Sequence, residues 1–257
     1  MSTLWQNILE EAAQASSAEP TLASFYFASV LDHESLAAAL AFNVALRLDN
    51  PTVPAAAIRE LCQQAMAAEQ YITEAIEADI IAYFERDPAC DRYSNPLLYF
   101  KGYQAIQAQR VAHWLWHQGR CALALYLQSL CARVFDVDIH PAARIGQGVM
   151  LDHATGLVIG ETARVGNNVS LLHDVVLGGS GCQSCQRHPK VEDGVLVAAG
   201  ARLFGNITIG EGSKIAAGSV VLADVPAHST AAGVPARVIG RPQVEQPALD
   251  MNQQFDS

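Results

Sequence analysis

An acid and an imidazole stand side by side in the stretch GVMLDHATGLVIGET, residues 148–162. A histidine that is held by a carboxylate can act as a general base and take the proton of an attacking hydroxyl. Asp152 and His153 follow Leu151, and because successive strand residues point to opposite faces, we expect these two side chains to point apart. Asp138 is then the candidate partner of His153. The alternative is two ordinary polar residues on a solvated face.

A second group of side chains that could bind a substrate is the basic stretch RHPK, residues 187–190. The guanidinium of Arg187 is suited to hold a carboxylate through two parallel hydrogen bonds, and His188 adds a further donor. This pattern indicates a site for the anionic part of a small molecule. The alternative is a basic loop tip that contacts only water.

Cys182 and Cys185 form a CxxC pair just before that stretch. A structural zinc site needs four ligands, and the sequence has no second CxxC, although His188 could be a third ligand. We therefore expect no metal and interpret the pair as loop cysteines, with redox sensitivity as the alternative. The cysteines of the chain are widely spaced, so a disulfide framework is not expected.

Small residues recur at one position of a repeat. Gly179, Ala199 and Ala217 each lie two residues after an aliphatic residue, and VAAG and IAAG are one coil apart. A column of small side chains leaves backbone amides and carbonyls within reach of a long, flexible ligand that carries amides of its own. The alternative is close packing at a corner of the fold.

The elements that must position these residues have a period of six. From residue 139 onward glycine becomes frequent and aliphatic residues recur at every sixth position, which fits neither a helix nor a plain strand. This period is typical of a parallel β-helix, in which each hexad forms a short strand and a turn. The aliphatic positions are 139, 145, 151, 159, 165, 171, 177, 191, 197, 203, 209, 215 and 221.

Two intervals in this series are too long. The interval 151–159 contains two extra residues beside the Asp152–His153 pair. We interpret the interval 177–191 as two hexads plus two residues, and expect the loop over 180–190 to leave the coil. Long loops on repeat scaffolds often carry binding residues.

The predicted fold class is therefore α + β, with a helical domain over residues 1–137 and a hexapeptide β-helix over 138–240. In the first part, Ala- and Leu-rich segments with apolar residues three and four positions apart predict helices, interrupted at Asn50-Pro51, Asp87-Pro88 and Gly119. The histidines and tryptophans of AHWLWH, residues 112–117, are interpreted as helix packing. Residues 241–257 are polar and predict a flexible C-terminal tail.

Composition limits the classes of function. The chain has 257 residues and a formal net charge of −10, which argues against a nucleic-acid-binding surface. No stretch approaches the roughly 20 apolar residues of a membrane span, and the first residues lack the pattern of a signal peptide. We expect no membrane association and a cytoplasmic location.

Taken together, these motifs resemble the serine O-acetyltransferase family over nearly the whole chain. The matching stretches are ERDPACDRYSNPLLYFKGYQAIQAQRVAHWLW, VDIHPAARIGQGVMLDHATGLVIGETA, LGGSG with RHPKV, and STAAGVPARVIGRP. The resemblance implies a left-handed parallel β-helix and trimers that pair into a hexamer. It also implies transfer of acetyl from acetyl-CoA to L-serine, giving O-acetylserine and CoA in the first step of cysteine synthesis. L-cysteine is the implied feedback inhibitor.

The resemblance also implies roles for single residues. His153 matches the general base and Asp138 its partner. The serine amine is held by two carboxylates, and the serine carboxylate by an arginine–histidine pair. These residues are Asp87 and Asp152 for the amine, and Arg187 and His188 for the carboxylate.

For the co-substrate, the resemblance implies contacts along the pantetheine arm and at the CoA phosphates. The pantetheine residues are Gly179, Ala199 and Ala217. The phosphate residues are Lys214, Arg237 and Arg241.

Three features depart from the family pattern. The loop holds Cys182, Cys185 and Gln186 where many relatives have glycines, lysines and an acid. His173 stands where a non-ionisable polar residue is expected. Many relatives end in an apolar residue that inserts into O-acetylserine sulfhydrylase, whereas this chain ends in QQFDS, which puts a complex with that partner in doubt.

Other functions remain open from the sequence. The chain could acetylate another acceptor, such as homoserine or a sugar, with acetyl-CoA. A γ-carbonic anhydrase-like zinc enzyme would need histidines that converge between neighbouring chains, and His153, His173 and His188 provide the number. A non-catalytic scaffold for a sulfhydrylase is disfavoured by the intact His153–Asp138 pair and by the altered C-terminus.

Overall fold

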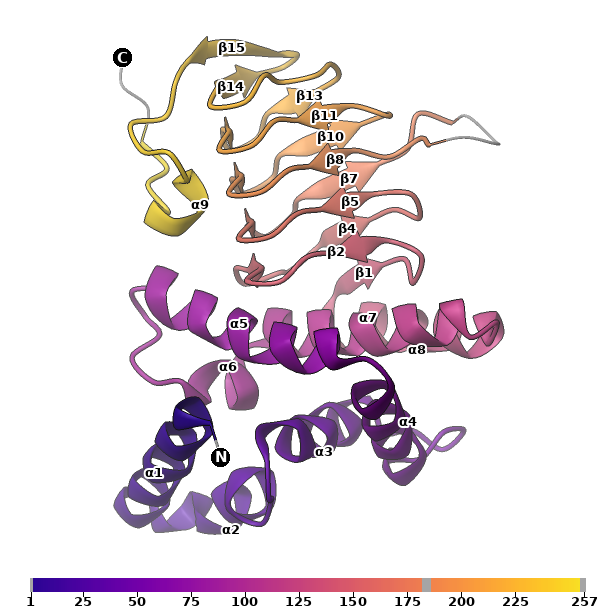
Figure 1. Ribbon diagram of the computed structural model, residues 1–257, viewed down its shortest axis with the longest axis vertical. Coiled ribbons are helices and arrows are strands. Elements are labelled where there is room, and N and C mark those ends of the chain that lie inside the picture. Colours follow the sequence, from indigo (N-terminus) through magenta and orange to yellow (C-terminus); the bar gives the residue numbers. More distant parts are fainter. Residues whose placement is uncertain (1, 182–185, 255–257) are drawn as a thin grey trace.

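The computed structural model describes residues 2–181 and 186–254, with a layer of helices below a stack of β-coils (Figure 1). The helices of the first part pack around one apolar core that continues into the coils. The helices are α1 (Thr3–Ala18), α2 (Ala23–Tyr26), α3 (Leu36–Leu48), α4 (Ala55–Ala68), α5 (Gln70–Arg86), α6 (Ser94–Tyr99), α7 (Lys101–His117) and α8 (Cys121–Phe135). A short 3₁₀ segment, η1 (Pro20–Leu22), and a π-helical segment, η2 (Phe27–Leu31), flank α2.

The helix boundaries follow from local chemistry. The hydroxyls of Ser2 and Ser35 accept hydrogen bonds from backbone amides in the first turns of α1 and α3, which satisfies donors that a helix start leaves unpaired. Helix α4 begins directly after Pro54, and α5 ends one residue before Asp87-Pro88. The predicted helical first part is confirmed, and the predicted breaks at Asn50-Pro51, Asp87-Pro88 and Gly119 all fall between helices.

Residues 137–240 form a parallel β-helix whose strands stack into three sheets. Sheet A contains β1 (Val137–Ile139), β4 (Leu157–Ile159), β7 (Val176–Gly178), β10 (Arg202–Phe204) and β13 (Val220–Val221). Sheet B contains β2 (Arg144–Ile145), β5 (Arg164–Val165), β8 (Lys190–Val191) and β11 (Thr208–Ile209). Sheet C contains β3 (Met150–Leu151), β6 (Ser170–Leu171), β9 (Leu196–Val197), β12 (Lys214–Ile215), β14 (Thr230–Gly233) and β15 (Ala236–Gly240).

The six-residue period marks the inward positions of these strands. Leu151 pairs with Leu171, which pairs with Val197, which pairs with Ile215, so one aliphatic column runs up the inside of sheet C. All four side chains are 1 % exposed or less. Burial of such columns is the main favourable contribution to the stability of a repeat fold. This is why the hexads predicted the inward positions of the strands correctly.

Each coil passes from sheet A through sheet B to sheet C, and the two corners that flank sheet A concern the site. We call the turn after a sheet A strand the AB corner, and the turn after a sheet C strand the CA corner. Leu177 lies in sheet A and Val191 in sheet B, so the long interval between them is a single AB corner. The interpretation as two hexads plus two residues is therefore wrong, because all the extra residues belong to one loop. Cys182 and Cys185 in this loop lie outside the described residues.

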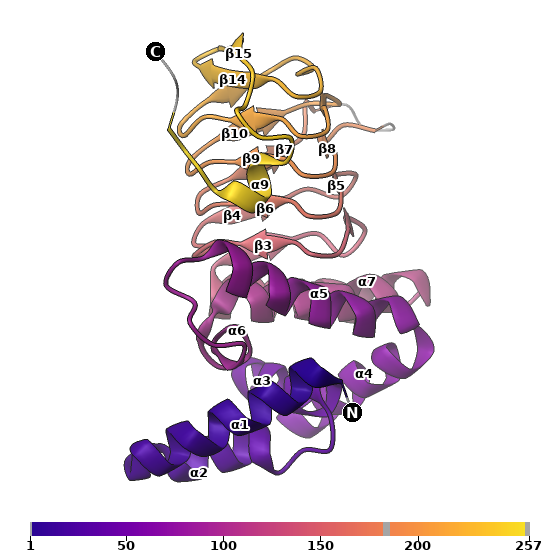
Figure 2. The ribbon, with the colours of Figure 1, turned by 60° about the vertical axis from the view of Figure 1, so that its left-hand side comes forward.

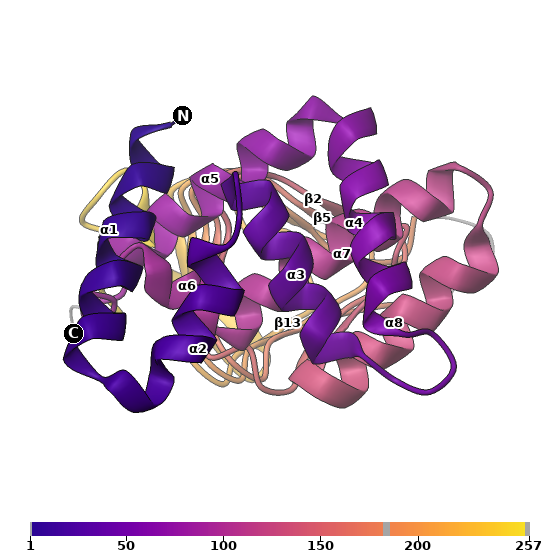
Figure 3. The same cartoon turned by 90° about the horizontal axis from the view of Figure 1, so that it is seen from below.

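Helices α5 and α7 cover the open end of the first coil, as the view from below shows (Figure 3). Backbone groups there have no preceding coil to pair with, so side chains of the helices take its place. The buried ion pair between Asp79 and Arg110, 2.7 Å apart, contributes three of these contacts. Asp79 accepts the amide of Val149, and Arg110 donates to the carbonyls of Ile145 and Gly146.

The C-terminal segment differs from the predicted flexible tail. Helix α9 (Pro247–Asp250) lies against sheet C, above α5 (Figure 2). Ala248 is fully buried, its carbonyl accepts the hydroxyl of Ser170, and its amide donates to the carbonyl of Gly194. Polar composition predicted a free tail, but two apolar residues, Pro247 and Ala248, are enough to dock it. Residues 255–257 lie outside the described part.

Across residues 2–181 and 186–254, no helix combines the length and the apolar character that crossing a bilayer requires.

Candidate active site

A cavity of about 310 Å³ lies where the helices meet the first coil. It contains three of the predicted site residues, Asp87, Asp152 and His153. Asp87 follows the end of α5, and the other two follow β3, so the helical part and the β-helix both contribute. The remaining lining residues are Tyr83, Ala89, Tyr99, Phe100, Lys101, Gly102, Leu151 and Thr155.

Asp152 and His153 occupy a turn at the CA corner rather than a strand. β3 ends at Leu151, and His153 and Ala154 adopt positive φ angles of 55° and 58°. The expectation that strand alternation points Asp152 and His153 apart is therefore wrong. Instead Oδ1 of Asp152 lies 3.9 Å from Nε2 of His153. The two extra residues of the first coil form this turn, which leaves the imidazole 78 % exposed at the mouth of the cavity.

His173 lies one coil above, with its ring 6.1 Å from that of His153 in an edge-on arrangement. Among the described residues, no hydrogen bond is made by its ring. Burial raises the pKa of the Asp152 carboxyl, and the charge of Asp87 raises it further, although His153 and His173 oppose the change. Together Asp87, Asp152, His153 and His173 are called the acid–imidazole group below. A cation, such as a substrate ammonium, would be favoured between the two carboxylates of this group.

Arg187 and His188 are brought together at the AB corner, where they return from the long loop. The guanidinium of Arg187 is paired with the carboxylate of Glu161. Thr162 fixes both residues of the pair, because its hydroxyl oxygen accepts the backbone amides of Arg187 and His188, at 3.0 and 3.2 Å.

Thr162 also fixes the tautomer of His188. The amide of Thr162 can only donate, and it donates to Nδ1 of His188 at 3.2 Å, so a neutral ring carries its proton on Nε2. Burial first, and then the charge of Arg187, lower the pKa of His188, so the ring stays neutral. Its Nε2–H is therefore a fixed donor. Gly160 and Gly179 leave room for the ring, since a Cβ at Gly160 would overlap it and one at Gly179 would come 3.0 Å from Nε2.

This placement separates Gly179 from the column of small residues. Ala199 and Ala217 share the CA corner, where the amide of Gly218 donates to the carbonyl of Ala199 at 2.8 Å. Gly179 follows sheet A, so it lies at the AB corner beside His188. The prediction of one column through all three residues is wrong for a single chain, because Leu177 belongs to sheet A and Val197 to sheet C.

Asp138 belongs with the Arg187 side of the molecule. It is the outward residue of β1, and its Oδ1 accepts the side-chain amide of Gln128 at 2.6 Å. His140 lies near Asp138, Glu161 and Arg187. Burial lowers the pKa of His140, the charges of Glu161 and Asp138 raise it, and the charge of Arg187 lowers it. Together Asp138, His140, Glu161, Arg187 and His188 are called the arginine group below. Within the described part of the chain, no hydrogen bond or ion pair joins Asp138 to His153.

The two groups therefore lie at opposite edges of sheet A. Along the chain, the turns that hold Asp152, His153 and His173 come before the strands of sheet A. The turns that hold most of the arginine group come after those strands. A strand of three residues, such as β4, is roughly 10 Å long, so the edges are too far apart for direct contact through one small substrate. One chain does not bring the predicted set of six residues into a single site.

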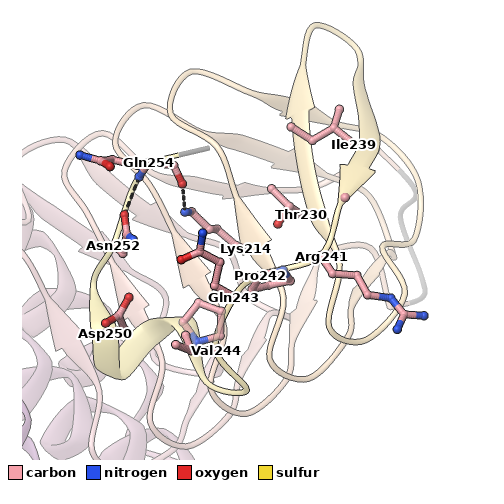
Figure 4. A pocket seen from close by; sticks show the side chains of 12 residues that line it. Lys214, Thr230, Ile239, Arg241, Pro242, Gln243, Val244, Asp250, Asn252 and Gln254 are labelled. Carbon is pink, nitrogen blue, oxygen red and sulfur yellow. Dashed lines mark hydrogen bonds between the residues drawn. The ribbon is translucent and has the colours of Figure 1, made fainter. Parts of the chain in front are cut away.

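The residues predicted for the CoA phosphates lie on the outer side of sheet C and its hairpin. Lys214 and Arg241 line a pocket against the C-terminal segment, in which Nζ of Lys214 donates to the carbonyl of Gln254 (Figure 4). The guanidinium of Arg241 points away from Lys214 in this view. Arg237 is exposed on β15, opposite Ala232 in the antiparallel hairpin.

Over residues 2–181 and 186–254, no three histidine, cysteine, aspartate or glutamate side chains are placed to hold a metal ion. His153 and His173 lie at the CA corner, whereas His188 lies at the AB corner.

Sequence reasoning missed the residues that hold the predicted ones in place. Glu161 and Thr162 stand in the quoted stretch as GET, and a signal was present, since a carboxylate and a hydroxyl follow shortly after the hexad position 159. Gln128 and Tyr83 come from helices, and nothing in their local sequence points to the β-helix.

Comparison with known proteins gives consistent matches. Residues 4–108 match the family model described as serine acetyltransferase, N-terminal. The serine acetyltransferase of Escherichia coli (strain K12) is 53 % identical over 253 residues, covering 98 % of this chain and 93 % of the relative. A crystal structure of serine acetyltransferase from Vibrio cholerae is 56 % identical, with a TM-score of 0.97, covering 99 % of this chain and 98 % of that one.

Three further solved structures are similar and contain ligands. A serine acetyltransferase in complex with cysteine is 49 % identical, with a TM-score of 0.96 and coverage of 98 % of both chains. The enzyme of Brucella abortus strain S19 in complex with coenzyme A is 49 % identical, with a TM-score of 0.92, and covers 94 % of this chain and 96 % of its own. That of Neisseria gonorrhoeae in complex with serine is 54 % identical, with a TM-score of 0.89, over 92 % and 98 %.

Proposed function

The chain belongs to the serine acetyltransferase family, and on that premise we propose that it transfers the acetyl group of acetyl-CoA to the hydroxyl of L-serine. The products are O-acetyl-L-serine and CoA. The observation that carries the proposal is the pair of complementary groups at the corners of sheet A. One group offers carboxylates beside a base, and the other offers a guanidinium beside a neutral imidazole donor, as an amino acid substrate requires.

His153 is the proposed general base. As the serine hydroxyl attacks the thioester carbonyl, its proton moves to the imidazole of His153. Collapse of the tetrahedral intermediate then expels CoA thiolate, which receives this proton from the imidazole. Asp138 orients the imidazole and stabilises its protonated form. General-base catalysis of this kind contributes typically about 10²- to 10⁴-fold to the rate.

Serine is held at both of its charged ends. Asp87 and Asp152 bind the ammonium, whose positive charge offsets the repulsion between the two carboxylates. The guanidinium of Arg187 and the Nε2–H of His188 bind the carboxylate. This two-point binding fixes the hydroxyl between the ends and selects a small amino acid over a sugar.

The site is completed by a second copy of the chain. The acid–imidazole group of one chain must meet Asp138, Arg187 and His188 of its neighbour, since one chain keeps them at opposite edges of sheet A. Three copies that turn sheet A toward a common axis place each CA corner against the next AB corner, which closes the ring.

The outer face of sheet A fits such a contact. The outward residues in register are Asp138, Val158, Val176, Arg202 and Val220. Three of these residues are valines, and Val158 is 36 % exposed in the single chain, so contact with a second copy would bury apolar side chains that here face outward. We propose this trimer as the active unit, and pairing of two trimers through the helical parts into a hexamer.

Acetyl-CoA is proposed to lie along the same interface. Ala199 and Ala217 of one chain leave the backbone open along the CA corner, and Gly179 of the neighbour faces them across the contact. The pantetheine amides can then pair with backbone groups of the coils. Lys214, Arg237 and Arg241 are the proposed contacts of the CoA phosphates. L-cysteine, which shares the charged ends of serine, is the proposed competitive inhibitor, whereas a complex with a sulfhydrylase is not part of the proposal.

The first experiment measures release of the CoA thiol from acetyl-CoA by the purified chain with L-serine, L-homoserine or no acceptor. We expect release that depends on serine and that L-cysteine suppresses. Release that is faster with homoserine, or that is absent with serine, would overturn the proposed substrate.

A second experiment tests the shared site by co-expression of two variants with different tags, assayed at a serine concentration below the KM of the wild type, where each variant alone has lost most of its activity. His153→Ala removes the base from one corner, and Arg187→Ala removes the clamp from the other. Because each site takes one corner from each of two neighbouring chains, about one third of the sites in trimers that contain both variants combine both native residues. Purified mixed trimers should regain about this fraction of the activity, whereas a site within one chain would regain none.

A further inference from the structure

Tyr83 of α5 reaches from the helical part to the strand that carries the acid–imidazole turn. Its hydroxyl donates to the carbonyl of Leu151 at 2.9 Å and accepts the amide of the same residue at 3.0 Å. Leu151 is the last residue of β3, directly before Asp152. A single side chain therefore holds both backbone groups of the residue from which the turn starts.

The position of β3 explains why these backbone groups need a partner. The amides of Met150 and Asp152 donate upward to the carbonyls of Val169 and Leu171 in the next coil. The backbone groups of Leu151 between them point the other way, where no coil precedes β3. The phenol of Tyr83 takes the place of that missing coil at this one residue.

The surroundings of Tyr83 keep its hydroxyl at this point. The side chain is 2 % exposed, and burial raises its pKa well above the ordinary range, so the phenol stays neutral and can both donate and accept. Its ring packs against Tyr103 edge-on, with centroids 6.1 Å apart, and against Phe100 at 5.7 Å. Little freedom remains for the ring.

Gly102 of α7 limits the turn from the opposite side. A Cβ at this position would overlap the carbonyl oxygen of Leu151, and it would lie 2.9 Å from the Tyr83 hydroxyl and 3.0 Å from Cβ of Ala154. The glycine therefore allows α7 to approach β3 closely. The turn that follows Leu151 is sensitive to such placement, because His153 and Ala154 hold positive φ angles that side chains rarely adopt.

We propose that Tyr83 is a positioning residue for the proton transfer, one that sets the place of the Asp152–His153 turn through Leu151. The inference rests on the proposed roles of Asp152 and His153. Tyr83 also lines the cavity that contains both of them, so the same phenol closes the floor of the site. In this arrangement the helical part determines the geometry of the reacting imidazole as well as capping the first coil.

The test compares Tyr83→Phe with Tyr103→Phe, in full-length protein with serine and acetyl-CoA. Tyr103 is an equally buried tyrosine whose hydroxyl donates to the carbonyl of Ile76 within the helical part. We expect Tyr83→Phe to lower kcat by about three- to tenfold, because small displacements of a reacting group are costly. The dissociation constant of CoA should stay unchanged, since Ala199 and Ala217 lie in later coils. Tyr103→Phe should keep kcat within about twofold at a similar loss of thermal stability.

Hydrogen exchange of the backbone gives a readout besides activity. The backbone amides of residues 150–156 should exchange faster in Tyr83→Phe than in the wild type. In Tyr103→Phe the exchange rates of the same amides should be unchanged. Gly102→Ala provides a second variant, which displaces the turn from the α7 side and should lower kcat in the same way even if Tyr83→Phe fails to fold.

Equal kcat in Tyr83→Phe, Tyr103→Phe and the wild type, with only the melting temperature lowered, would overturn the inference and leave Tyr83 a purely structural residue. This outcome is distinct from a failure of the proposed function, in which the wild type itself would release no CoA with serine.

Discussion

The two corners that flank sheet A are built from the same repeat, yet they are held in different ways. At the AB corner, Thr162 and Glu161 of one coil fix Arg187 and His188 of the next, so the arginine group is supported from within the β-helix. At the CA corner, the turn that holds His153 starts from Leu151, which is tied to Tyr83 of a helix. The β-helix alone can therefore hold the AB corner, whereas the CA corner of the first coil depends on the helical part.

This difference suggests a division of work. The AB corner offers fixed donors for a carboxylate, which act equally before and during the reaction. The CA corner offers a base, which matters only when the proton moves. Variants of His153 should therefore act mainly on kcat, and variants of the carboxylate-binding residues at the AB corner mainly on the KM for serine.

The largest effect is expected for His153→Ala. Loss of the base should lower kcat by about 10²- to 10⁴-fold, measured as the rate of CoA thiol release at saturating substrates. CoA binding, measured by calorimetry, should stay nearly unchanged, because the imidazole is mostly exposed and supports no other side chain. A variant with the wild-type rate would remove His153 from the mechanism.

Arg187→Ala should have the next largest effect, and on a different constant. The lost charge-assisted hydrogen bonds to the serine carboxylate should raise the KM for serine by roughly ten- to a hundredfold with a smaller change in kcat. Arg59→Ala is a control, since this arginine lies on α4 over the ring of Phe42, in the helical part of the chain. If Arg187→Ala lowered kcat and left KM unchanged, the two corners would not divide the work as described.

Thr162→Val should produce a smaller effect at the same corner. The substitution keeps the shape of the side chain but removes the hydroxyl that accepts two amides and contacts His188. We expect kcat/KM for serine to fall by about three- to tenfold. Thr73→Val, on the exposed side of α5, should leave the kinetics unchanged. Equal behaviour of both variants would mean that the corner is held by Arg187 and Glu161 alone.

The smallest effect concerns pH. The pKa of Asp152 is raised, so its carboxyl becomes protonated at a higher pH than an ordinary aspartate as the pH falls. Since only the ionised form attracts the serine ammonium, the KM for serine should rise on acidification from that higher pH onward. Asp152→Asn should remove this dependence and raise KM at neutral pH. If the pH profile of KM were identical in the wild type and in Asp152→Asn, the rise of KM at low pH would belong to another group.

Much of the fold could be predicted from the sequence because it depends on local pattern. The aliphatic hexads identified the inward residues of the strands, since only burial of those positions stabilises a coil. Proline pairs marked helix ends because proline excludes the preceding residue from helical geometry. The C-terminal segment was the exception, where docking through Pro247 and Ala248 outweighed its polar composition.

The arrangement of the candidate site was not predicted from the sequence. Asp152 and His153 line one cavity, but the reason given for their orientation assumed a strand where the chain makes a turn. Gly179 was placed in the wrong column, because the corner a residue occupies depends on how many residues every earlier loop inserts. The contacts of Gln128 and Tyr83 were not predictable, since they join positions far apart in the sequence.

The sequence by itself determined the period of the coils, the helical first part and the set of chemical groups available, because each of these depends on side chains close together along the chain. Only the tertiary structure decided which corner receives each group, which tautomer His188 adopts and which helix supports the turn of His153. These depend on loop insertions and on hydrogen bonds between distant elements, and such bonds form only after the aliphatic columns have fixed the coils in register.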